Sequence, residues 1–180
     1  MGEKARAIHP AAWLVYTVHQ RVLDKLRRQP VEDYRIDFED GYGSRSNDEE
    51  DRHAVQAAEE TVSALAARSL PPYFGIRIKP LHDALRGRGT RTLELYLTRL
   101  LARTAGVLPA QFVVTLPKVH SPGEVEVLTR AVQDLEQRLG LAPRSIRIEL
   151  MVDVLIKESL AVEVAYPAQR VPTYRQHHAQ

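Results

Sequence analysis

Polar and hydrophobic residues alternate strictly along residues 34–39, which read Tyr-Arg-Ile-Asp-Phe-Glu. A period of two is typical of a β-strand with one buried face and one polar face. The same alternation recurs over residues 74–79 and 145–153, and the more apolar stretch 111–119 has the composition of a central strand. The pattern therefore predicts strands at 34–40, 74–79, 111–119 and 145–153.

Between these segments the apolar residues are spaced three and four apart, which is typical of amphipathic helices. This spacing predicts helices over residues 11–28, 47–68, 90–101 and 122–139. Ser46 or Asn47 is expected to cap the second helix, Thr90 the third, and Ser121 the fourth as part of a capping box with Glu124. The segment RGRGT before the third helix reads as a loop.

Strand and helix thus alternate four times, which is typical of parallel βα units. Three of the strands carry one apolar and one charged face, whereas strands covered by helices on both sides are apolar on both. The interior of a closed barrel can hold converging charges, so we predict an α/β fold, a partial TIM (β/α)8-type barrel with about four βα units. We expect one domain over residues 1–165 and a loop-like or disordered tail over 166–180.

Composition and charge narrow the range of functions. The chain has 180 residues, a formal net charge of +2 and no cysteine, which leaves no thiolate nucleophile and little electrostatic reason to bind nucleic acid. Arg86, Arg88 and Arg91 lack the interleaved aromatic residues of a nucleic-acid surface. No apolar run reaches the roughly 18 residues of a membrane span. We therefore expect a cytoplasmic homo-oligomer that binds neither nucleic acid nor membrane.

Charged side chains gather near the ends of the predicted strands, where α/β proteins build their sites. The residues concerned are Arg35, Asp37, Glu39, Arg77 and Lys118. They either form a functional site or fill a barrel as a salt-bridge network without a substrate. Burying charges costs several kcal/mol unless every group is paired, which favours a site.

Four segments, IDFEDGYG, FGIRIKPL, TLPKV and the strand ending in MVDV, resemble the HpcH/HpaI aldolase and citrate lyase beta-subunit family. Their order and spacing agree over residues 33–156, and they look closest to a longer, uncharacterised aldolase-like branch. The resemblance implies a TIM barrel of the phosphoenolpyruvate/pyruvate superfamily. It also implies that the protein makes or breaks a carbon–carbon bond in a 2-oxo acid or an acyl-CoA ester, with Mg2+ or Mn2+.

The resemblance assigns roles to individual residues. Arg77 matches the family's strand arginine, which holds the substrate carboxylate or enolate oxygen, a task suited to a planar guanidinium. Arg35 and Asp37 stand beside it as expected substrate-binding residues.

Further roles follow from the same match. Glu39 and Asp40 resemble the acidic pair that orders metal-bound water, and Lys118 resembles their electrostatic partner. Asp153 stands where the family normally has a glutamate that binds the metal, and Glu149 is the alternative ligand on the same strand face.

Two functions stay open. The first is a metal-dependent lyase or aldolase that acts through an enolate. The second is a partial barrel without catalysis that acts as a structural or oligomerisation module. The second metal carboxylate distinguishes them, since the family's aspartate has no counterpart after Asp153: residues 154–180 contain Glu158 and Glu163 but no Asp.

Overall fold

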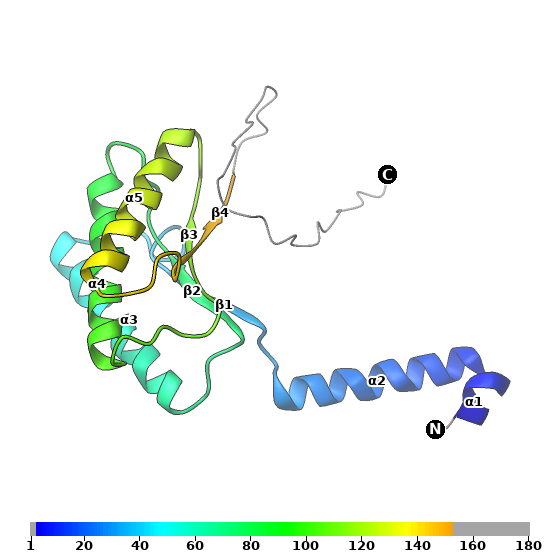
Figure 1. Cartoon of the computed structure of the whole chain (residues 1–180). Coiled ribbons are helices and arrows are strands. Elements are labelled where there is room, and N and C mark those ends of the chain that lie inside the picture. The colour runs from blue at the N-terminus through cyan, green and yellow to red at the C-terminus, as the bar shows by residue number, and fades with distance from the viewer. Residues whose placement is uncertain (1–2, 153–180) are drawn as a thin grey trace.

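The structure is a computed structural model that describes residues 3–152, so Asp153 and the predicted tail lie outside the described residues (Figure 1). The elements in chain order are α1 (Glu3–Ile8), α2 (Pro10–Arg28), β1 (Asp33–Asp37), α3 (Asn47–Ala66), β2 (Tyr73–Arg77), α4 (Arg86–Arg103), β3 (Phe112–Leu116), α5 (Pro122–Arg138) and β4 (Arg147–Leu150). The predicted α/β class and the four predicted strands are confirmed.

The four strands form one parallel sheet in the order β1-β2-β3-β4, so strands adjacent in the sequence are also adjacent in space. One row of register partners, Ile36, Ile76, Val114 and Ile148, is apolar across all four strands. Ile76 and Val114, on the central strands, are fully buried. This row faces the helices, because burial of apolar area is the main stabilising term in folding.

Helices α3, α4 and α5 lie together on one side of the sheet (Figure 1). Their apolar stripes complete the core, to which Leu97, Leu100 and Leu128 contribute fully buried side chains. The opposite face of the sheet is covered by none of the described helices, and we call it the open face. The alternation of βα units thus places every helix after β1 on one side and leaves the polar strand residues on the other.

Helix α4 begins at Arg86, four residues before the predicted start, so the predicted RGRGT loop with Thr90 as its cap was wrong. The Thr90 hydroxyl instead donates to the carbonyl of Arg86 within the helix (2.9 Å). Gly89 allows close packing here, since a Cβ at this position would lie 2.8 Å from the carbonyl oxygen of Lys79. A glycine that reads as a loop signal in the sequence therefore serves helix packing.

The other caps agree only in part with expectation. The Ser46 hydroxyl caps α3 by accepting from the backbone N–H of Glu49 (3.3 Å). At α5 the Ser121 side chain accepts no capping hydrogen bond; it donates to the Glu124 carboxylate, which also accepts from the backbone N–H of His120. The Glu124 carboxylate thus reaches the N–H one residue before the cap and not that of Ser121, so the predicted capping box was wrong in its hydrogen bonds.

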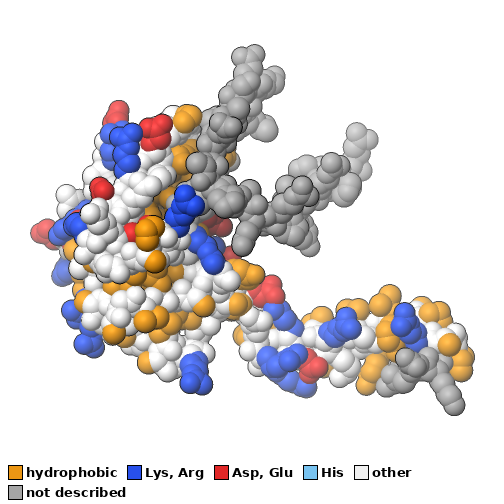
Figure 2. All heavy atoms as spheres, viewed as in Figure 1, with side chains coloured by type: hydrophobic (Ala, Val, Ile, Leu, Met, Phe, Trp, Pro, Cys, Tyr) orange, Lys and Arg blue, Asp and Glu red, His pale blue; other side chains and the backbone are white. Residues whose placement is uncertain are grey.

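Helix α2 was predicted as an amphipathic helix and is one, but it has no buried residue. It leads away from the sheet, and hydrophobic side chains are exposed along its length (Figures 1 and 2). None of the described helices is long and apolar enough to cross a membrane.

Candidate functional site

A row of polar register partners crosses the open face of the sheet near the carboxyl ends of its strands. Asp37 pairs with Arg77, Arg77 with Thr115, and Thr115 with Glu149. We call these four residues the polar row. Side chains alternate between the two faces of a strand, so the same phase that buries the isoleucines and Val114 presents the polar row on the open face.

Asp37 is the most heavily bonded carboxylate of the polar row. Arg77 grips it with two nitrogens, Nε to Oδ1 at 2.8 Å and Nη2 to Oδ2 at 2.6 Å. The backbone N–H groups of Glu39 and Gly41 also donate to it, each at 2.9 Å. Gly41 is required for this approach, because a Cβ there would lie 2.6 Å from Asp37 Oδ2.

These contacts shift the titration of both partners. The hydrogen bond from Arg77 lowers the pKa of Asp37 to about 2, and the same bond raises the pKa of Arg77 above its usual value. The pair is therefore charged throughout the physiological pH range. Its geometry leaves the third guanidinium nitrogen, Nη1, outside the bidentate contact.

Nη1 of Arg77 faces a carboxylate oxygen that has no hydrogen bond. It lies 3.8 Å from Glu39 Oε2, which is buried and has no hydrogen-bond partner within residues 3–152. The Glu39 side chain is only 6% exposed. Because buried polar atoms normally find a partner, this gap marks a place where a further polar atom would be stabilised.

Lys118 holds the two carboxylates that follow β1. Its ammonium lies 2.5 Å from Glu39 and 2.6 Å from Asp40, and we call these three residues the lysine cluster. The hydrogen bond to Asp40 raises the pKa of Lys118, and the hydrogen bond from Lys118 lowers the pKa of Asp40. Lys118 also has φ of +50°, a left-handed backbone uncommon for a residue with a side chain. The turn that follows β3 thus directs this ammonium toward the end of β1.

Arg35 belongs to a separate group on the same face. Its Nε donates to Thr115 Oγ1 and Glu149 Oε2, both at 3.3 Å. To reach β3 and β4 the side chain must cross β2, where its register partner is Gly75. The absence of a side chain at Gly75 leaves the path clear, so Arg35 links β1 to the far half of the sheet.

The structure therefore brings together most of the predicted site residues, in two neighbouring groups. The first holds Asp37, Glu39, Asp40, Arg77 and Lys118, and the second holds Arg35 and Glu149. Thr115 also belongs to the second group and was not predicted from the sequence. It lies two residues after Val113, so alternation along the third strand places both side chains on the same face and could have indicated Thr115. Asp153, the first predicted metal ligand, lies outside the described residues.

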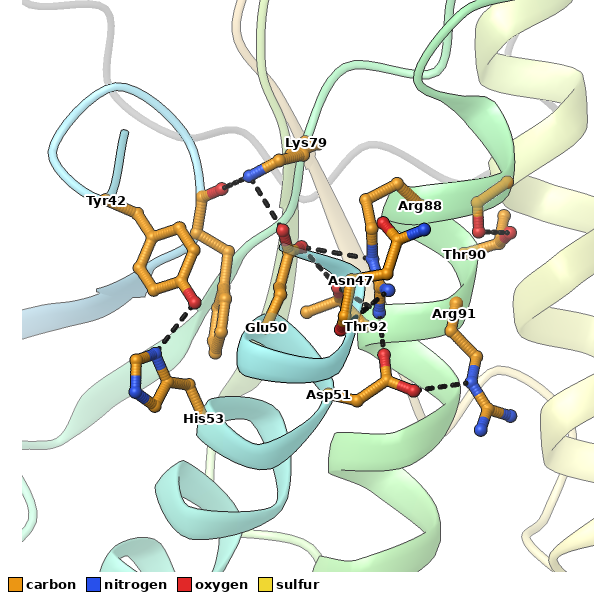
Figure 3. Close-up of polar contacts among 12 residues, drawn as sticks. Tyr42, Asn47, Glu50, Asp51, His53, Lys79, Arg88, Thr90, Arg91 and Thr92 are labelled. Atoms are coloured by element: carbon orange, nitrogen blue, oxygen red, sulfur yellow. Dashed lines mark hydrogen bonds and ion pairs between the residues drawn. The ribbon is translucent and has the colours of Figure 1, made fainter. Parts of the chain in front are cut away.

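A third charged group, also missed, lies among the helices (Figure 3). Glu50 of α3 is 1% exposed and contacts Lys79 (3.1 Å), Arg88 (3.4 Å) and the hydroxyl of Thr92 (2.6 Å). Arg88 also binds Asp51, and we call these five residues the Glu50 cluster. Helical spacing in the sequence could have indicated this cluster. Glu50 lies on the same buried side of α3 as Ala54, Ala58 and Thr61.

The chemistry available on the open face is the binding of anionic oxygen atoms. Arg77 Nη1 and the Lys118 ammonium are donors, and the free oxygen of Glu39 can accept a proton or a hydrogen bond. Within residues 3–152, no group of three or more His, Cys, Asp or Glu side chains is placed to hold a metal ion.

Comparisons with known proteins bear on the family alone. No curated protein and no solved structure matches the chain. A family model described as "Domain of unknown function (DUF6986)" matches residues 1–167, so the chain belongs to the DUF6986 family.

Proposed function

We propose that the open face is the catalytic face of a metal-dependent carbon–carbon lyase or aldolase of the citrate-lyase-like type, acting on a 2-oxo acid or an acyl-CoA ester through an enolate. The observation that carries the proposal is the polar row, which places a polar side chain on each of four adjacent parallel strands. A sheet face that contacts only water does not require polar residues at matching positions of neighbouring strands. A site that binds a small anion at the carboxyl ends of parallel strands does require them.

In this proposal Arg77 holds the substrate through Nη1. Its other two donors are occupied by Asp37, so the guanidinium is fixed before substrate arrives. A fixed donor costs little entropy on binding and stabilises the negative charge that develops on an enolate oxygen. Asp37 therefore acts as a positioning residue for Arg77.

The lysine cluster supplies the proton-handling groups. Glu39 has one oxygen on Lys118 and one without a hydrogen bond, so it can orient a water molecule toward the substrate. The hydrogen bond from Lys118 lowers the pKa of Asp40 and so favours the ionised form of that carboxylate.

Mg2+ or Mn2+ fits the donor chemistry of the open face, because these ions prefer carboxylate oxygens and retain several waters. Glu149, whose side chain is 45% exposed, and Asp153 would hold the ion. When bound it would supply Lewis-acid stabilisation of the enolate.

The same proposal includes a (β/α) barrel. Sequential strand order with all following helices on one side is the arrangement of barrel segments, in which the other face becomes the interior. The open face would then be enclosed by further strands, and its charges would converge on the substrate.

The test is calorimetric titration of the folded chain with Mg2+ or Mn2+ in the presence of oxalate, which mimics the enolate of pyruvate. We expect metal-dependent binding that is lost in Asp153→Ala and weakened in Glu149→Gln. Asp83→Ala is the matched control, because Asp83 is 96% exposed and pairs only with nearby Arg86 in the described structure.

Equal metal binding by the unchanged chain and by Asp153→Ala would show that Asp153 does not hold the metal. Absence of binding by the folded chain would contradict catalysis by this chain alone.

That second result would favour the alternative function, a partial barrel that acts as a structural or oligomerisation module. One observation supports this alternative: Asp37, Glu39, Asp40 and Glu149 each already have a cationic partner. Paired charges of this kind can stabilise a polar interface as well as a substrate site.

A further inference from the structure

Helix α2 carries an unpartnered apolar stripe. Val15, Val18, Val22 and Leu26 follow one another at spacings of three and four, which places them on one side of the helix. They are 70%, 50%, 49% and 55% exposed, respectively. A helix of 19 residues with this much exposed apolar surface gains stability only when a partner covers it.

A groove of matching character lies beside β1, at the edge of the sheet. It has a volume of about 450 Å³ and is lined mainly by apolar side chains, among them Tyr34, Ile36, Ala57, Ala64, Leu70 and Phe74. On the α3 side the lining residues are small, Ala57, Thr61 and Ala64 at spacings of four and three. Small residues in such a row allow a second helix to approach closely.

The charges of the two surfaces are complementary. Helix α2 contains four residues with basic side chains, Arg21, Lys25, Arg27 and Arg28, and one with an acidic side chain, Asp24. Helix α3 contains six acidic residues, of which Glu50, Asp51 and Glu59 already pair with Lys79 or with arginines of α4. Glu60 is the acidic residue of α3 that lines the groove. It is exposed and has no ion pair within the described part of the chain. A basic helix would therefore be attracted to this side of α3.

The helix is directed away from the groove of its own chain. Only residues 29–32 separate α2 from β1, and one of them is Pro30. Lys25 forms an ion pair with Glu32, and the backbone N–H of Gln29 donates to the carbonyl of Lys25 (2.7 Å), so the last turn of α2 is tied to the connection. Figure 1 shows α2 leading away from the sheet. Folding back would break the ion pair and reverse the chain within four residues.

We propose that the occupant of the groove is α2 of a second copy of this chain, and that two copies exchange α2 reciprocally to form a symmetric dimer. Reciprocal exchange covers both stripes and both grooves with a single kind of contact, which is the low-cost route to a two-fold assembly. It also places a helix beside β1, the edge strand that pairs only with β2 in the described sheet. The proposal does not depend on catalysis by the open face.

The first test is the mass of the full chain in solution, measured by light scattering and by sedimentation over a range of concentrations. We expect the mass of two chains for the unchanged protein and the mass of one chain for Val22→Asp, which places a charge in the apolar stripe. Gln20→Asp is the matched control, because it adds the same side chain to the opposite side of α2 and should leave the dimer intact. Circular dichroism establishes that each variant keeps its helices.

The second test uses the absence of cysteine from the sequence. One tagged copy carries Val22→Cys and a differently tagged copy carries Ala64→Cys, and mild oxidation should join the two tags in one disulfide-linked dimer. A monomeric wild-type chain, or a dimer that Val22→Asp leaves unchanged, would overturn the proposal. A chain that carries both cysteines and forms the disulfide only within itself would overturn it as well, since α2 would then occupy its own groove.

Discussion

The lysine cluster on the open face and the Glu50 cluster among the helices contain the same kinds of charge in different environments. Glu50 is 1% exposed and contacts two cations and a hydroxyl, which join α3 to β2 and α4. Glu39 is also buried, but one of its oxygens has no hydrogen bond within the described residues, and its partner Lys118 is 37% exposed. The Glu50 cluster also contains a buried atom without a hydrogen bond within the described residues, Arg88 Nε, which lies 3.4 Å from Glu50. The two clusters therefore differ in access to solvent. The side chains of Glu50, Lys79 and Arg88 are at most 13% exposed and fix the packing of helices, whereas Lys118 is accessible and can contact a ligand.

The largest expected effect is on stability, at the Glu50 cluster. Replacing Glu50 with Ala leaves Lys79 buried without a carboxylate and leaves Arg88 with Asp51 alone, so the free energy of unfolding should fall by about 3 kcal/mol. Urea unfolding followed by circular dichroism measures the change. Glu59→Ala on the same helix is the control: Glu59 is one-third exposed and pairs with Arg99 and Arg103, so the loss should stay within about 1 kcal/mol. Equal losses in the two variants would remove the distinction between the clusters.

A smaller effect on stability is expected at Asp37. Its pKa is lowered to about 2, so the stabilisation that its charge provides is complete above its ordinary pKa of 3.8 and is lost as the pH falls through about 2. Asp37→Asn should therefore lower the free energy of unfolding by about 1–2 kcal/mol near neutral pH, after allowance for solvent screening.

Urea titrations of the wild type and Asp37→Asn between pH 6 and pH 2 test this expectation. The difference between the two proteins should be constant above about pH 5, by linkage, and should shrink toward pH 2. Asp83→Asn, at an exposed loop position, should show no such dependence. A difference that grows as the pH falls would contradict the lowered pKa of Asp37.

The smallest effect on stability is expected at Lys118. Lys118→Met should lower the free energy of unfolding by less than about 1 kcal/mol, because the Lys118 side chain is accessible to water and Arg77 remains 3.8 Å from Glu39 as a second cation. Oxalate binding should nevertheless weaken about tenfold through loss of a charge-assisted contact near the ligand. Arg130→Met, on the exposed side of α5, is the control for loss of one positive charge. A destabilised Lys118→Met with unchanged oxalate binding would place Lys118 among the structural charges.

Much of the fold was predictable, because period-two alternation marks three of the strands, apolar composition marks the third strand along the chain, and helical spacing marks every long helix. The start of α4 was not, since Gly87 and Gly89 resemble loop residues until the packing of Gly89 against Lys79 is known. The tie between Arg88 and Glu50, 38 positions apart, likewise depends on helix packing that no local pattern contains.

The candidate site was likewise predictable only in part. Alternation placed Asp37, Glu39 and Arg77 on one face, and the parallel register brought them together. The contact between Lys118 and Glu39 was not predictable in the same way, because it lies at a left-handed turn at Lys118 that no glycine marks in the sequence. Alternation also groups Lys79 with Arg77, yet Lys79 lies past the end of β2 and reaches Glu50 instead.

The common phase of the four strands restricts which insertions and deletions the gene can accept. Removing one residue from β3 would turn Thr115 toward the helices and Val114 toward the open face, because a shift of one position exchanges the faces of a strand. The polar row and the apolar row beneath it would be broken in the same event. Length variation among relatives should therefore collect in the connections between strands and helices, and the strands themselves should change only by substitution.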